Sequence, residues 1–384
     1  MSQFGKRSLF SYLLNNPQKE NIDNRRDVNV SSPDALAILT ALSFDEKPRK
    51  MFFLFPTIYE AEEFTQILGD YLESNQVFMF PYDEILRSSA IGVSPEMSLE
   101  RESAIASIFD DTPSILVAHG SSSILQIAPK DRYKKHINTI SKGDMLDKEV
   151  LIKELSSIGY SYIDRVTNRN QIATRGEILD VFDSYYKNPI RIQFFGDEID
   201  DIRFFNVQDE LSFEHVDKII IHPASLLLLE DEEIKNGFES IDKEIQEILD
   251  LKKDRRAIDI LSSKLEEIKM EVIDKNLKDI HQRFYPLFCK DDVSILDYIQ
   301  DYEKFIYQPN ETISSIKNVK NKEKTYFNSA YEETLSLKEE KVYKEIKTTF
   351  EDYSSITYKE DGTAFIVRDN GFKAISYSQS NLML

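Results

Sequence analysis

The sequence has few of the residues that build redox or metal chemistry. It contains one cysteine, Cys289, and no tryptophan. Because a single cysteine cannot form a disulfide within the chain, a reducing, cytoplasmic compartment is expected. The five histidines have no paired spacing with one another or with Cys289 that suits zinc. We therefore expect no metal and no other cofactor.

Long apolar runs and an excess of positive charge are also missing. No apolar stretch approaches the ~20 residues of a membrane helix. The short run from Ser8 to Leu14 lacks a following small-residue cleavage site, so we expect no signal peptide. The formal net charge is −20, from 68 acidic and 48 basic residues. Because nucleic-acid backbones attract basic surfaces, non-specific binding to DNA is not the main activity that we expect.

The first part of the chain alternates strand and helix signals. Apolar runs predict strands, and helical spacing with capping residues predicts helices. Strands that are separated by helices pair in parallel through right-handed crossovers. The sequence therefore predicts a doubly wound α/β layer, with strands at 28–30, 51–55, 77–80 and 114–118 and helices at 35–42, after Thr57 and at 94–109.

Later segments extend this pattern. We expect a strand at 137–140, a helix at 148–158, a parallel-type strand at 216–221 that returns to the first layer, a mostly helical stretch at 232–282 and a linker at 308–325. Leu226 to Leu229 followed by Glu230-Asp231 imitates the magnesium-binding strand end of a nucleotide hydrolase. The favoured interpretation is a strand that enters a helix start, where acidic residues suit the helix dipole.

The loop after the first predicted strand decides whether this layer binds a nucleotide. A phosphate loop needs G-x-x-x-x-G-K-[ST], because glycines let backbone amides reach the phosphates and lysine neutralises their charge. Residues 28–36 contain neither glycine nor lysine, and Asp34 would repel a phosphate. Gly5-Lys6 lacks a glycine at the required upstream spacing, and no G-x-S-x-G elbow surrounds Ser121 to Ser123. We therefore expect a chain that is not an enzyme.

The most informative stretch runs from Gly159 to His215 and predicts four or five short strands between turn signals. In its run from Ile190 to Phe195, alternate side chains point to opposite faces, which places Arg191, Gln193 and Phe195 together. An arginine and an aromatic on a solvent face are typical of protein-binding hot spots. The alternative is that Phe195 belongs to a core and Arg191 is a solvated charge.

The motifs of this stretch are GY-x4-RV, ATRGEILDVF and PIRIQFFGDEIDDIRFFN, followed by Ser-x-Glu. Together they resemble the inserted domain that the excision-repair protein UvrB shares with the bacterial transcription-repair coupling factors. The later PASLLLLEDEE and SILDYI resemble the coupling factors in particular. The resemblance extends over residues 30–310.

This resemblance implies an α/β fold in which a degenerate RecA/helicase-like parallel sheet domain is interrupted by a small inserted α+β domain that binds UvrA, with a partial C-terminal α/β segment. The expected boundaries are 1–126 and 216–310 for the two parts of the UvrB-like domain, 127–215 for the inserted domain and 311–384 for a linker and partial following domain. The resemblance also implies that Arg175, Arg191 and Phe195 bind UvrA. Gln193 is a weaker candidate, and Gly176 lets the chain turn after Arg175.

The function implied by the resemblance is recruitment of UvrA in transcription-coupled nucleotide excision repair. In that family the polymerase-binding domain and the ATP-dependent DNA translocase lie beyond the region that this sequence matches, so RNA polymerase and double-stranded DNA are partners of the full-length family. The alternative is a UvrB-like ATPase that loads onto damaged DNA, which requires the phosphate loop that residues 28–36 lack. A third hypothesis is a degraded pseudogene product with no partner.

Overall fold

The computed structural model describes residues 27–30, 32–82, 94–250, 269–270, 272–273, 277, 285–291, 293–319 and 372–377. Within these residues the chain forms a six-stranded parallel sheet, a second six-stranded sheet, and a two-stranded ribbon. The predicted α/β class with a parallel sheet is confirmed. Residues 1–26 and most of the expected linker and partial domain at 311–384 lie outside the described residues.

The first sheet has the strand order β1-β14-β13-β2-β4-β3. Its four predicted strands are found at or within one residue of the expected positions. They are β1 (Asp27–Val30), β2 (Met51–Phe55), β3 (Val77–Phe80) and β4 (Ile115–His119). The predicted helices are also present, as α3 (Pro33–Glu46), α4 (Ile58–Gly69) and α6 (Pro95–Ile108). Thr57 caps α4 as expected, because its side chain accepts a hydrogen bond from the Glu60 amide.

Both faces of the first sheet are covered. On one face Phe53 and Phe55 of β2 pack against Phe64 of α4, with ring centroids 4.9 Å apart in both pairs. On the other face Phe52 and Leu54 belong to the core cluster that includes residues of α6. Every residue of β2 is therefore buried, as expected for a strand in a sheet that lies between helices.

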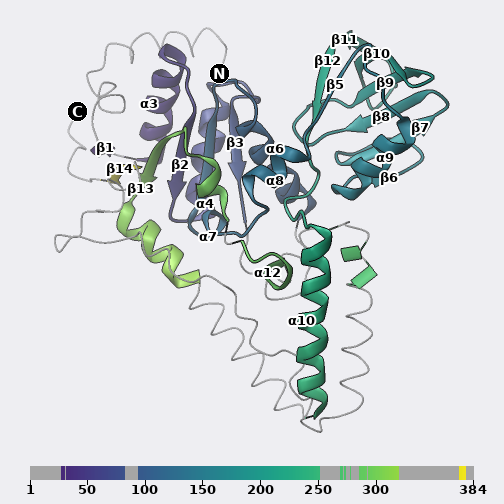
Figure 1. The fold of residues 1–384 in the computed structure, drawn as a ribbon. Helices are drawn as coiled ribbons and strands as arrows, with labels where there is room; N and C mark the ends of the chain where they lie inside the picture. Colours follow the sequence, from purple (N-terminus) through teal and green to yellow (C-terminus); the bar gives the residue numbers. More distant parts are fainter. Residues whose placement is uncertain are drawn as a thin grey trace.

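The second sheet has the strand order β11-β10-β9-β8-β7-β6 and forms a lobe beside α6 and α8 (Lys130–Lys135) (Figure 1). Its six strands, rather than the four or five expected, are β6 (Ser161–Tyr162), β7 (Gln171–Arg175), β8 (Ile178–Phe182), β9 (Ile190–Phe195), β10 (Glu198–Phe205) and β11 (Ser212–His215). Its inner face packs on α9 (Lys148–Ser157) and joins the same core cluster as the α6 side of the first sheet. The other face, called here the outer face, carries the candidate residues.

The strand expected at 216–221 does not return to the first sheet. Residues Lys218–Ile221 form β12, which pairs antiparallel with β5 (Asn138–Ser141) in the separate ribbon. The physical reason is one-sided burial, since Ile219 and Ile221 are buried while Lys218 is exposed. Strands β5 and β12 therefore form a short ribbon where the chain enters and leaves the second-sheet lobe.

The linker expected at 308–325 is wrong for its first part. Residues 309–319 are helical, and Ile313, Ile316 and Val319 are buried. The chain then contributes β14 (Phe372–Tyr377) to the first sheet, between β1 and β13 (Glu303–Tyr307). Residues 372–377 thus pair within the first sheet. Pairing partners this far apart in sequence leave no local signal.

The described part of α10 (Asp231–Asp250) extends away from the two sheets (Figure 1). It begins at the acidic run where a helix start was expected. The strand expected at 226–229 is absent, because its carbonyl groups accept hydrogen bonds from side chains and loops and not from a ladder: Leu228 accepts from Arg132 and Tyr285, and Leu226 accepts from the Ala128 amide. None of the described helices is long and apolar enough to cross a membrane.

Candidate functional site on the outer face of the second sheet

Strand β9 places the candidate residues as the alternation predicts. Ile190, Ile192 and Phe194 are buried on the inner face. Arg191, Gln193 and Phe195 lie on the outer face, and their exposure rises along the strand. The Arg191 side chain is 12% exposed, whereas Phe195 is 80% exposed. The interpretation of Phe195 as a core residue is therefore wrong.

Arg191 is not the open guanidinium that a hot spot would present. Its Nε and Nη2 atoms donate to the two carboxylate oxygens of Asp180 at 2.7 and 2.8 Å, and the Asp180 side chain is 3% exposed. The residues face each other because β8 and β9 pair Asp180 with Arg191. The guanidinium carbon also lies 4.3 Å from the ring centroid of Phe205. The hydrogen bonds that Arg191 donates to Asp180 raise the pKa of Arg191.

Arg175 ends β7 and is 46% exposed. Its two Nη atoms donate to the Glu210 carboxylate at 3.0 and 2.9 Å, and Arg165 Nε lies 2.7 Å from the same carboxylate. The hydrogen bond with Glu210 raises the pKa of Arg175, and the hydrogen bond from Arg175 lowers the pKa of Glu210. Arg191 Nη1 donates to the Glu210 backbone carbonyl at 3.4 Å. The turn that carries Glu210 thus brings the predicted arginines together.

Phe195 lies at the same end of the sheet as the turn after Arg175. The Phe194 amide donates to the Glu177 carbonyl at 2.8 Å, so β9 runs beside this turn. Gly176 has φ +57°, and a Cβ built on it would meet nothing within 4 Å. The glycine is therefore needed for its backbone conformation and not for space, as expected. Phe195 and Arg175 flank one turn.

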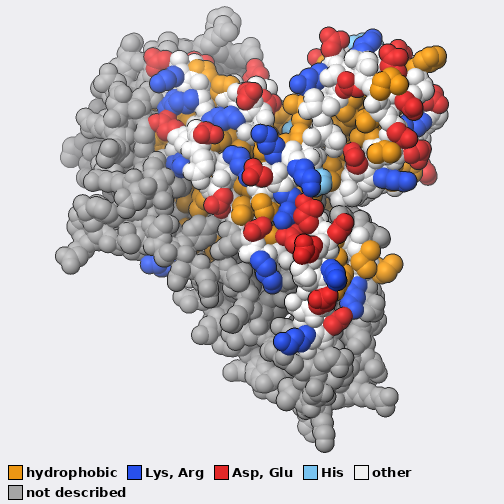
Figure 2. Space-filling view, viewed as in Figure 1, with side chains coloured by type: hydrophobic (Ala, Val, Ile, Leu, Met, Phe, Trp, Pro, Cys, Tyr) orange, Lys and Arg blue, Asp and Glu red, His pale blue; other side chains and the backbone are white. Residues whose placement is uncertain are grey.

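Gln193 has a partner within the sheet. Its Oε1 accepts a hydrogen bond from Arg203 Nη1 at 3.1 Å, and Arg203 also pairs with Asp201. His215 Nδ1 lies 2.9 Å from Asp201 Oδ1. Figure 2 shows acidic and basic side chains interspersed on the described residues of this lobe. The outer face is thus a network of mutually paired charges from which Phe195 projects.

Sequence reasoning missed the internal partners of the arginines. Arg165 stands in the GY-x4-RV motif but received no role, and Asp180 is the one charged residue within the ILDVF strand. That lone carboxylate was a usable signal, because a charged residue in a strand needs a partner when it is buried. Glu210 lies in the acidic turn Asp209-Glu210, which is unremarkable in so acidic a chain.

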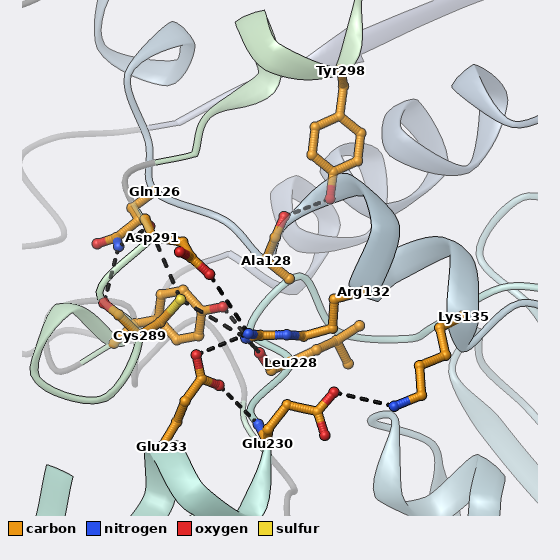
Figure 3. Close-up of polar contacts among 11 residues, drawn as sticks. Gln126, Ala128, Arg132, Lys135, Leu228, Glu230, Glu233, Cys289, Asp291 and Tyr298 are labelled. Carbon is orange, nitrogen blue, oxygen red and sulfur yellow. Dashed lines mark hydrogen bonds and ion pairs between the residues drawn. The ribbon is translucent and has the colours of Figure 1, made fainter. Parts of the chain in front are cut away.

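A second polar cluster joins α8, α10 and the segment at 289–291 (Figure 3). Arg132 of α8 (Lys130–Lys135) contacts Glu233 of α10 at 2.8 Å, Asp291 at 3.7 Å and Cys289 Sγ at 3.8 Å. The ligand atoms of Glu233, Cys289 and Asp291 lie within 4.8 Å of one another, which is a spacing that a metal would accept. The Arg132 cation already occupies this cluster, and burial raises the pKa of the Cys289 thiol. The cluster is better suited to tie segments together than to hold a metal.

A buried serine and histidine lie at the carboxyl end of β4. Ser121 Oγ lies 3.2 Å from His119 Nδ1, and the Tyr82 amide donates to His119 Nε2 at 3.0 Å. The His119 side chain also accepts a hydrogen bond from the Ser122 amide, so backbone amides already use its acceptor capacity and it is poorly placed to remove a proton from Ser121. Burial, with a contribution from Arg101, lowers the pKa of His119 to about 3. The pair therefore does not form an activated nucleophile.

The amides at the start of α3 are capped by hydrogen bonds within the chain. Ser32 Oγ accepts a hydrogen bond from the Ala35 amide at 3.2 Å, and the Ser32 carbonyl accepts from Leu36 at 3.2 Å. Asp34 lies in the first turn of the helix, where an anion would otherwise bind. Ser31 is outside the described residues.

Comparison with known proteins identifies the lobe. Residues 139–227 match the family model described as the UvrB interaction domain. The match begins in β5 and extends past β12, so it includes the entry ribbon and the whole second sheet.

The chain is also similar to transcription-repair-coupling factors. It is 26% identical to that of Bacillus subtilis over 319 residues, which cover 83% of this chain and 27% of the relative. It is 22% identical to that of Staphylococcus haemolyticus over 62% of this chain and 22% of the relative, and 23% identical to that of Staphylococcus aureus over 56% and 19%. The chain thus spans about a quarter of the length of the curated relatives it matches.

Proposed function

We propose that this chain, which contains a UvrB interaction domain and is similar over most of its length to transcription-repair-coupling factors, recruits UvrA through the outer face of its second sheet. The observation that carries the proposal is Phe195, a large apolar side chain that is 80% exposed and lies on the same face of the sheet as Arg175 and Arg191. An exposed aromatic beside arginines has the composition of a protein-binding hot spot. Its proposed role is to enter an apolar pocket on UvrA.

The two arginines have different proposed roles. Arg175 is half-exposed and available to a carboxylate on UvrA. Arg191 is held by Asp180 and stacks on Phe205, so it supports the surface from below. Replacing Arg191 with alanine would leave the buried Asp180 carboxylate unpaired. A loss of binding in that variant would therefore not distinguish contact from misfolding.

The test is a titration of the chain against UvrA, with wild type beside the double variant Arg175→Ala, Phe195→Ala. We expect the double variant to lose at least tenfold in affinity while it unfolds cooperatively at the wild-type temperature. The matched control is Tyr59→Ala, which removes an exposed aromatic from α4 in the first domain and should bind as wild type does. Wild-type affinity in the double variant would reject the outer face as the site.

The first sheet is proposed to be a degenerate RecA/helicase-like domain that does not hydrolyse nucleotides and uses no cofactor. Support comes from its parallel pairing and from the loop 28–36, which has no glycine or lysine and whose helix amides bond to Ser32. Saturable binding of a fluorescent ATP analogue would favour the UvrB-like ATPase instead. In the same proposal the chain works in the cytoplasm. RNA polymerase and double-stranded DNA are proposed as partners of the full-length family.

A further inference from the structure

The arginines of the outer face all have carboxylate partners within the chain, but the pairs differ in exposure. Asp180 and Arg191 are 3% and 12% exposed. Glu210 is 26% exposed, and its partners Arg175 and Arg165 are close to half-exposed. Exposed ion pairs contribute little to stability, because water solvates the separated charges well, whereas a buried pair cannot separate without leaving charges unsolvated. Of the Asp180 and Glu210 pairs, those of Glu210 are the ones exposed enough to exchange partners readily.

A hydrogen-bonded turn holds Glu210 in place. The Glu210 amide donates to the Asn206 carbonyl at 2.9 Å, and the Asn206 amide donates to the Leu211 carbonyl at 3.0 Å. The Asp209 carboxylate accepts from the Leu211 amide at 3.0 Å. Glu210 itself has φ +60°, a left-handed conformation that is uncommon for a residue with a side chain. Strained residues of this kind cluster at binding sites and switch regions.

The pair between Glu210 and Arg175 has the geometry of a contact between two proteins. Glu210 accepts from both Nη atoms of Arg175, which is the bidentate arrangement that arginine forms with carboxylates. That edge of the guanidinium holds one carboxylate at a time. A carboxylate from another protein would therefore have to replace Glu210 at this edge. Leu211, next in the chain, is 66% exposed and offers apolar surface beside the exchange.

We infer that Glu210 is a built-in competitor: it occupies Arg175 and Arg165 in the free chain, and an aspartate or glutamate of UvrA takes its place on binding. This inference rests on the proposed function. Glu210 then sets the affinity of the outer face without itself contacting the partner's carboxylate. The partner chemistry that it implies is an acidic side chain next to an apolar pocket that receives Phe195.

The decisive variant is Glu210→Gln, because it keeps the shape of the side chain but removes the competing charge. We expect it to bind UvrA about threefold to tenfold more tightly than wild type, since the exposed ion pair no longer has to be broken. The matched control is Asp209→Asn, which makes the same change in net charge one residue away and keeps an oxygen to accept from Leu211. Its affinity should stay within twofold of wild type.

A second readout needs no partner. Phenylglyoxal modifies accessible arginines, and peptide mass spectrometry measures the rate at each one. In Glu210→Gln we expect Arg175 and Arg165 to react severalfold faster than in wild type or Asp209→Asn. Arg191 should react at an unchanged slow rate, because Asp180 still holds it. Superimposable thermal unfolding curves would show that the variants are folded.

The outcomes separate the inference from the proposed function. If Glu210→Gln binds UvrA no better than Asp209→Asn, or binds more weakly, Glu210 positions the arginines and does not compete, which overturns the inference while the proposed function stands. If wild type does not bind UvrA at all, the proposed function fails. The modification rates still decide the inference in that case, because unchanged rates at Arg175 would show that Glu210 does not shield it.

Discussion

Strands β2 and β9 show how the two sheets of this chain differ. The residues of β2, Met51–Phe55, are all buried, because helices or the rest of the core cover both faces of the first sheet. In β9, Ile190–Phe195, burial alternates, because only the inner face is covered. The same residue type therefore has opposite environments: Phe53 is buried in the core, whereas Phe195 is exposed to solvent. The first sheet is a scaffold, and the second presents side chains.

The largest expected effect of a single substitution is at Phe53. This side chain is fully buried and its ring lies 4.6 Å from that of Phe305 and 4.9 Å from that of Phe64. Phe53→Ala should lower the free energy of unfolding by about 4 kcal/mol, from lost burial and the cavity left behind. Phe195→Ala should change it by less than about 0.5 kcal/mol. Urea denaturation of both variants checks the contrast, and equal losses would remove the distinction between the sheets.

The next effect concerns the pair beneath the outer face. Asp180→Asn should lower the free energy of unfolding by about 3 kcal/mol, because it leaves the partly buried Arg191 cation without its carboxylate. Glu210→Gln should cost less than about 1 kcal/mol, because its pairs are exposed. Denaturation curves compare the two variants directly. The double variant Asp180→Asn, Arg191→Met should recover part of the loss, and failure to recover any would assign the loss to something other than the unpaired charge.

A smaller, pH-dependent effect distinguishes the interior of the first domain. Burial keeps His119 neutral by lowering its pKa from 6.5 to about 3. Since the unfolded chain binds this proton below pH 6.5 and the folded chain does not, stability is lost as the pH falls from 6.5 towards 3. At pH 5 this histidine should account for about 2 kcal/mol of the loss. His119→Gln should unfold with a flatter pH dependence between pH 6.5 and 5, and an unchanged slope would mean that His119 is protonated when folded.

The fold of the first domain was largely readable from sequence. Strands β2 and β3 were predicted at their observed ends, and Thr57 was predicted to cap α4. These features depend on local apolar runs and capping residues. The insertion of β14 beside β1 and the pairing of β12 with β5 were not predicted, because each depends on a partner far away in the chain.

The sequence predicted which candidate residues share a face of the sheet, but not which charged residues pair with them. Alternation placed Arg191, Gln193 and Phe195 on one face, as observed. It could not show that Asp180 faces Arg191, because this depends on the register between β8 and β9. It also could not place Glu210 against Arg175, because the turn closes through hydrogen bonds specific to 206–211. Whether each arginine can bind a partner thus depends on the tertiary structure, which sets its carboxylate partner within the chain.

The most direct test of the central claim places a photoreactive group on the outer face. Phe195 is replaced by p-benzoylphenylalanine, and Tyr59, exposed on α4, is replaced likewise as the control. Irradiation with UvrA should give a crosslinked product from position 195 and none from position 59. Equal crosslinking from both positions, or crosslinking from position 59 alone, would contradict the assignment of the second sheet as the presenting surface.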